Sequence, residues 1–161
     1  MRVMAGTFFT RYDYENVDSD GAKKLTAELA RRIGESGFVG SNISGRAVTE
    51  AGDFSYTDPV DGSVAKNQGL YVKFDDGSRF VVRLSGTGSS GATIRLYIEK
   101  HDSVWPPPIV WLLAELGANG WQNESTYGLD AQDYLRDNIR LAVDFLRFKE
   151  FVGREEPDVR T

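Results

Sequence analysis

Cysteine is absent from the 161 residues, so disulfide bonds and thiol chemistry are excluded. The first residues, MRVMA, lack the apolar run of a secretory signal. No apolar run approaches the roughly 20 residues that a membrane-spanning helix requires. The nearest candidate, IVWLLAEL, covers only residues 109–116. We therefore expect a protein of a reducing compartment, with a cytoplasmic location and no membrane partner.

Positive charge is also scarce, since 19 Lys and Arg residues stand against 24 Asp and Glu residues, giving a net charge of −5. A chain with this balance is not expected to bind nucleic acid or anionic membranes, although it can still carry a local basic site. The length and the 40% hydrophobic content indicate one domain that is large enough to bury a core.

Two helices are predicted from apolar residues at helical spacing. The first follows VDSDG, is capped by Asp18 or Ser19, and ends at Gly34. The second begins near Asp130, where Asp133 follows at capping-box spacing, and ends before Gly153. The apolar faces consist of Ala22, Leu25, Leu29 and Ile33 in the first helix, and of Leu135, Ile139, Ala142 and Leu146 in the second.

Between the helices, residues 45–99 alternate apolar and polar side chains, which indicates antiparallel strands. The turn sequence DDGS at residues 75–78 joins YVKF to RFVV as a short hairpin. The order of helix, meandering strands and helix predicts an α+β domain, with helices packed on one face of an antiparallel sheet.

The stretch RLSGTGSSGATIR, residues 83–95, contains the spacing G-x-G-x-x-G at Gly86, Gly88 and Gly91. Strand-like sequence lies on both sides of it, so the strand-to-helix context of a dinucleotide-binding loop is missing. Protein kinases also place such a loop between strands, but the chain has no H-R-D or D-F-G segment. Both nucleotide-binding interpretations are therefore rejected.

The expected register of this hairpin indicates an anion site. If Leu84 and Ile94 face each other in the core, Arg83 must face Arg95 on the other side of the sheet. Like charges directly opposite are unfavourable, so a fixed anion or an acidic neighbour is expected nearby.

The glycines can present successive backbone N–H groups, and Ser85, Thr87, Ser89 and Ser90 add hydroxyls. Two guanidinium groups with these donors suit phosphate. The alternative is a flexible hairpin with solvated arginines.

The stretch RLSGTGSSGATIRLYIE resembles the phosphate-binding loop in the C-terminal domain of eukaryotic-type α-phosphoglucomutase, within the α-D-phosphohexomutase superfamily. GTFFTRYDYE, DFSYTDPVDGSVAKNQGL and FKEFVGREEPDVRT resemble the same branch. The resemblance implies an isomerase of carbohydrate metabolism that interconverts glucose 1-phosphate and glucose 6-phosphate, using a phosphoserine, magnesium and glucose 1,6-bisphosphate in the full enzyme. It also implies a sheet of about four strands.

By the same resemblance, the residues that grip the phosphate of the phosphosugar are Arg83, Ser85, Gly86, Thr87, Gly88, Ser89 and Arg95. No catalytic residue, metal ligand or cofactor is expected in this chain, because the family's serine loop, magnesium loop and sugar-specificity loop do not occur in it. The catalytic, metal-binding and sugar-binding domains are expected to be absent, with those domains of the same enzyme as partners. The alternative is a free-standing phosphosugar-binding or regulatory module without catalysis.

One segment departs from the family. Residues 103–121, SVWPPPIVWLLAELGANGW, contain all three tryptophans and three of the five prolines. The family has no such insert within the single domain expected over residues 1–161. A loop insertion, a partner-binding patch and translated non-coding sequence are the three interpretations of this segment.

Overall fold

The computed structural model describes residues 4–53, 56–57, 60, 64–65, 69–88, 91–105 and 130–161. The first strand, β1 (Met4–Val17), leads into helix α1 (Ser19–Ile33). The central strands and the C-terminal elements follow in this order: β2 (Asn42–Ile43), β3 (Arg46–Asp53), β4 (Tyr56–Thr57), β5 (Val64–Ala65), β6 (Leu70–Phe74), β7 (Ser78–Gly88), β8 (Gly91–Trp105), α3 (Ala131–Tyr134), α4 (Arg136–Phe145), α5 (Phe148–Phe151) and β9 (Val159–Arg160).

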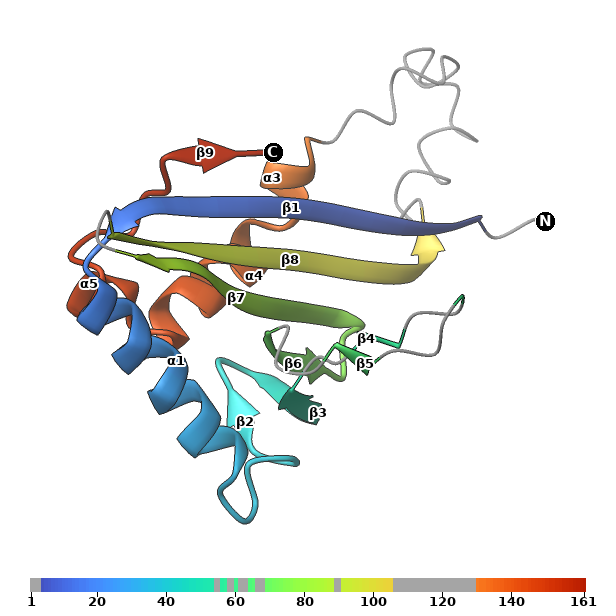
Figure 1. Ribbon diagram of the computed structural model, residues 1–161. Coiled ribbons are helices and arrows are strands. Elements are labelled where there is room, and N and C mark those ends of the chain that lie inside the picture. The colour runs from blue at the N-terminus through green and yellow to red at the C-terminus, as the bar shows by residue number, and fades with distance from the viewer. Residues whose placement is uncertain are drawn as a thin grey trace.

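In the described residues, seven strands form one antiparallel sheet in the order β2-β3-β6-β7-β8-β1-β9, and β4 pairs separately with β5 (Figure 1). The α+β class is confirmed, but the expected number of about four strands is too low. Strands β2 and β9 have two residues each, which is too short to produce a periodic pattern. The long strand β1 is also missed by the pattern analysis, although it pairs with β8 along most of its length.

The two faces of the sheet differ sharply. One face carries the apolar core, in which Tyr14, Phe80 and Ile94 are almost fully buried. Helices α1, α3 and α4 contact this face. The side chains that alternate with the core residues, such as Arg83 and Arg95, lie on the opposite face, called here the open face. The predicted placement of helices on one side is therefore confirmed for the described helices.

Helix α1 begins and ends where its capping residues predict. The Asp18 carboxylate accepts a 2.8 Å hydrogen bond from the Gly21 N–H, and Gly34 is the C-cap. A Cβ atom on Gly21 would lie 2.1 Å from the carbonyl oxygen of Phe151 in α5. Only glycine therefore allows the start of α1 and the end of α5 to approach this closely.

The predicted C-terminal helix is divided into α3, α4 and α5. Asp130 caps α3, as expected, by accepting a hydrogen bond from the Gln132 N–H. Only Leu135 separates α3 from α4. The break between α4 and α5 is sharper, because Arg147 there has a left-handed backbone with a φ of 56°. Leu146 and Phe148 are both buried, and residues two apart cannot share one face of a helix. The left-handed residue between them turns both side chains into the core.

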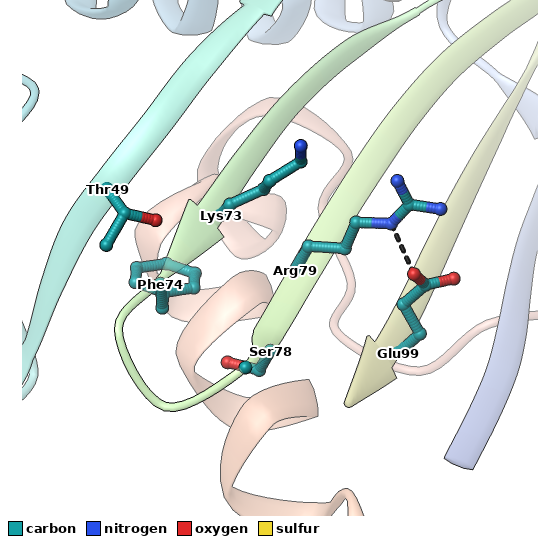
Figure 2. Close-up of a pocket in the computed structure, with 7 residues that line it drawn as sticks. Thr49, Lys73, Phe74, Ser78, Arg79 and Glu99 are labelled. Carbon is teal, nitrogen blue, oxygen red and sulfur yellow. Dashed lines mark ion pairs between the residues drawn. The ribbon is translucent and has the colours of Figure 1, made fainter. Parts of the chain in front are cut away.

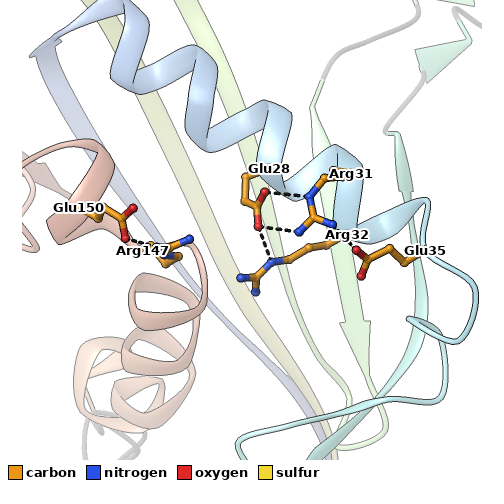
Figure 3. Close-up of polar contacts among 6 residues, drawn as sticks. All are labelled: Glu28, Arg31, Arg32, Glu35, Arg147 and Glu150. Atoms are coloured by element: carbon orange, nitrogen blue, oxygen red, sulfur yellow. Dashed lines mark hydrogen bonds and ion pairs between the residues drawn. The ribbon is translucent and has the colours of Figure 1, made fainter.

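Ion pairs join neighbouring turns in the last part of helix α1 (Figure 3). The Glu28 carboxylate accepts hydrogen bonds from the guanidinium groups of Arg31, at 2.9 and 3.0 Å, and of Arg32, at 3.0 Å. These hydrogen bonds lower the pKa of Glu28 to about 2. Arg31 also pairs with Glu35.

The C-terminal residues close the edge of the sheet beside β1. Arg11 and Thr161 exchange backbone hydrogen bonds of 2.9 and 3.0 Å, and the Asp158 N–H donates a 2.9 Å hydrogen bond to the Asp13 carbonyl. Val159 lies opposite Asp13 in the register. The end of the chain thus lies beside the strand that also borders β8.

Candidate anion site

The predicted opposition of the two arginines is confirmed. In the register of β7 and β8, Leu84 lies opposite Ile94 and Arg83 lies opposite Arg95. Leu84 is partly buried and Ile94 completely buried, so both arginines emerge on the open face, where both are exposed. The two arginine side chains therefore leave the sheet from directly opposite positions, close to its glycine-rich end.

The glycine-rich stretch is mostly strand rather than loop. Ser85 lies opposite Thr93, the register then shifts, and Gly88 lies opposite Gly91. Gly86 has a φ of 63° and Gly91 a φ of 96°, and both values favour glycine. The hairpin thus keeps pairing almost to its tip. Ser89, Ser90 and the side chain of Thr87 lie outside the described residues.

The first residue of β8 lies against the end of β1. A Cβ atom on Gly91 would lie 3.2 Å from the Cα of Asn16 and 3.3 Å from the carbonyl oxygen of Val17. This close approach, together with the positive φ, explains a glycine at position 91. It also fixes the start of β8 relative to the junction between β1 and α1.

Sequence reasoning missed Asp13, which supplies the acidic neighbour. In the register of β1 and β8, Asp13 lies directly opposite Arg95, so the row across the sheet reads Arg83, Arg95, Asp13. Asp13 is only 6% exposed, and its Oδ1 lies 3.1 Å from the Nε of Arg11. The alternation in TRYDYE places Arg11 and Asp13 on one face, but it does not reveal the pairing of β1 with β8.

The opposite end of the sheet is electrically balanced. An open depression of about 240 Å³ lies beside the DDGS turn and includes Lys73, Arg79 and Glu99 in its lining (Figure 2). Arg79 Nε lies 2.5 Å from Glu99, and Lys73 Nζ lies 2.8 Å from Glu50. Each of these two cations therefore has a carboxylate partner of its own.

The described residues contain no cluster of three or more His, Asp or Glu side chains that could hold a metal ion. No described helix is both long enough and apolar enough to span a membrane. Residues 103–105 of the Trp- and Pro-rich segment continue strand β8, and Trp105 pairs with Met4 through the backbone. Residues 106–121 of that segment lie outside the described residues.

Comparisons with known proteins agree on one family. A family model described as phosphoglucomutase-1, C-terminal domain, matches residues 6–105. A phosphoglucomutase of Aspergillus fumigatus is 60% identical over 156 residues, which cover 96% of this chain and 24% of the relative. A cytoplasmic phosphoglucomutase of Mesembryanthemum crystallinum is 42% identical over 96% of this chain and 24% of its own length.

Among solved structures, the exocytosis-sensitive phosphoprotein parafusin from Paramecium, a phosphoglucomutase in its open form, superposes with a TM-score of 0.68. It is 36% identical, and the match covers 97% of this chain and 23% of that protein. The chain therefore spans about a quarter of the length of the relatives it matches.

Proposed function

This chain belongs to the phosphoglucomutase family as its C-terminal domain, and on that premise we propose that it holds the phosphate that is not being transferred. The ligands are glucose 1-phosphate and glucose 6-phosphate. The observation that carries the proposal is the placement of Arg83 directly opposite Arg95 beside the glycine-rich tip.

The binding set is Arg83, Ser85, Gly86, Thr87, Gly88, Ser89 and Arg95. Each guanidinium presents a planar fork of N–H donors to a pair of oxygens of the phosphate dianion, and each charge-assisted hydrogen bond contributes about 1.5–3 kcal/mol. The dianion also removes the repulsion between the two arginines. Backbone N–H groups near Gly86 supply further donors, because its left-handed backbone suits an anion-binding nest.

Binding alone does not transfer a phosphoryl group. The reaction needs a nucleophile, a metal and charge stabilisation assembled around one substrate. We assign the phosphoserine, the magnesium ion and the glucose 1,6-bisphosphate to the rest of the full enzyme, because this chain spans about a quarter of the phosphoglucomutases that it matches. Magnesium would there neutralise charge on the transferring phosphate.

In this account, residues 1–161 form one phosphate-binding domain whose partners are the preceding domains of the same enzyme. Residues 103–121 are an insertion in it, starting at the end of β8. We expect a cytoplasmic enzyme, and the name of the Mesembryanthemum relative, a cytoplasmic phosphoglucomutase, supports this expectation.

Substitution of the two arginines tests the proposal. Arg83→Ala and Arg95→Ala should each weaken the binding of glucose 6-phosphate about ten- to a hundredfold, measured by titration calorimetry at low salt. Lysine should restore only part of the affinity, because it keeps the charge and loses the fork. Arg79→Ala is the matched control, because Arg79 lies on the same strand and open face but at the other end of the strand, opposite Glu99. Equal affinities for all variants would contradict the proposal.

A mixing experiment separates an enzyme domain from a free-standing module. A phosphoglucomutase truncated before its C-terminal domain should recover glucose 6-phosphate formation when this chain is added or co-expressed, and the Arg95→Ala chain should restore much less. Phosphosugar binding without any recovery would favour the free-standing module.

A further inference from the structure

Asp13 is buried although it belongs to the open face. In the register of the sheet, Asp13 lies between Arg95 of β8 on one side and Val159 of β9 on the other. The residue is 6% exposed, and within the described part of the chain its Oδ1 has no hydrogen-bond donor. A buried carboxylate without a cation is costly, so Asp13 requires an ion-pair partner.

Among the described residues, two arginines beside Asp13 on the open face can take that position. Arg11 precedes Asp13 by two residues and lies on the same face of β1, while Arg95 is directly opposite on β8. The other nearby arginines have partners elsewhere. Arg154 pairs with Asp158, and Arg160 pairs with Glu156 and lies over the Tyr12 ring at 5.4 Å.

Arg11 takes the position in this structure. Its Nε lies 3.1 Å from Asp13 Oδ1, although the contact is not aligned as a hydrogen bond. Within the described residues, the exposed Arg95 guanidinium has neither an ion pair nor a hydrogen bond. If Asp13 paired with Arg95 instead, a phosphate would have to compete with that carboxylate.

We propose that Arg11 is a positioning residue that keeps the Asp13 carboxylate away from Arg95, so that Arg95 stays available to the phosphate. The inference rests on the proposed function. It differs from a direct role of Arg11 on the ligand, because Arg11 acts through Asp13.

The test is a pair of substitutions with inorganic phosphate as the probe. Arg11→Met keeps the aliphatic stem, and it frees Asp13 to pair with Arg95. If that pair forms about 80–90% of the time, phosphate affinity falls about five- to tenfold. Adding Asp13→Asn removes the competitor and should return the affinity to within about twofold of the unaltered chain. Lys73→Met, which removes the partner of Glu50 on the same face, is the control.

Each outcome decides the matter. Weak binding by Arg11→Met that Asp13→Asn does not restore would mean that Arg11 contacts the phosphate itself, and would overturn the proposal. Unchanged binding by Arg11→Met would also overturn it. Circular dichroism checks folding, and if Arg11→Met fails to fold, two other variants decide. Asp13→Asn alone must not weaken binding more than about threefold, and Arg11→Lys must bind about as well as the unaltered chain.

A ligand-free measurement keeps this inference separate from the proposed function. The NMR relaxation of the Arg95 Nε–H group should indicate a mobile side chain in the unaltered protein and a more ordered one in Arg11→Met. If phosphate does not bind to the unaltered chain, the proposed function fails. The relaxation of Arg95 still shows whether Asp13 changes its partner from Arg11 to Arg95. Identical Arg95 relaxation in both proteins would contradict the exchange.

Discussion

The hydroxyl of Tyr14 donates a 2.7 Å hydrogen bond to the backbone carbonyl of Glu155. Tyr14 is fully buried, and its ring packs against Phe148 with centroids 4.3 Å apart. The contact ties the last part of strand β1 to the segment that precedes β9. Burial raises the pKa of Tyr14 well above its usual value, so the hydroxyl remains a donor at every physiological pH.

Tyr14→Phe keeps the ring and leaves the Glu155 carbonyl without this donor. We expect the free energy of unfolding to fall by about 1–2 kcal/mol, measured by urea denaturation. Tyr71→Phe is the control, because the Tyr71 hydroxyl donates to Glu50 on the exposed face, and its effect should stay within about 0.5 kcal/mol. Similar losses in the free energy of unfolding for both variants would mean that the hydrogen bond to Glu155 stabilises the fold no more than the exposed one to Glu50.

Gly21→Ala tests the close approach of α1 and α5. The added Cβ would collide with the Phe151 carbonyl at 2.1 Å, so we expect a loss of about 1–3 kcal/mol in the free energy of unfolding. Gly34→Ala in the same helix is the comparison, because its Cβ would meet atoms only at 3.5 Å and beyond. A thermal melt of the two variants decides, and an unchanged melting temperature for Gly21→Ala would be evidence against this packing.

Much of this fold could be predicted from local patterns. Helix α1, its caps at Asp18 and Gly34, the DDGS turn and the opposition of Arg83 and Arg95 all depend on residues that are close in sequence. In each case, side-chain periodicity or turn chemistry determines the outcome within a few residues.

The rest depends on contacts between distant segments. Asp13 becomes part of the site only because β1 pairs with β8, about eighty residues away, and no local pattern encodes that register. The break at Arg147 follows from the burial of both Leu146 and Phe148, which requires the finished core. Helical periodicity alone extends the helix through this point.

Glu28 predicts a dependence of stability on pH. Its hydrogen bonds with Arg31 and Arg32 lower its pKa from 4.5 to about 2. The group therefore stabilises the fold fully above pH 4.5, and this contribution is lost as the pH falls towards 2. A carboxyl carbon NMR titration should show a midpoint near the lower value, and Glu28→Gln should remove the difference in stability. A midpoint at or above 4.5 would contradict the bridge shown in Figure 3.

The isolated chain should show no interconversion of glucose phosphates, even with magnesium and glucose 1,6-bisphosphate present. The chain spans about a quarter of the phosphoglucomutases that it matches, and phosphate affinity alone positions a substrate without transferring a group. A coupled assay for glucose 6-phosphate, run against a blank without protein, provides the measurement. Reproducible turnover above the blank, abolished in a matched Arg95→Ala preparation, would show that the chain is catalytic by itself.

The most direct test of the phosphate site is a chemical-shift titration of the isolated chain with glucose 6-phosphate at low salt. Affinity as weak as millimolar is expected without the other domains, so the ligand must reach tens of millimolar. We predict that the amide signals of Gly86, Thr87, Gly88 and Ser89 move most, while those of the DDGS turn at residues 75–78 stay in place. Shifts of the amide signals at the turn, with none in the glycine-rich stretch, would contradict a phosphate site at Arg83 and Arg95.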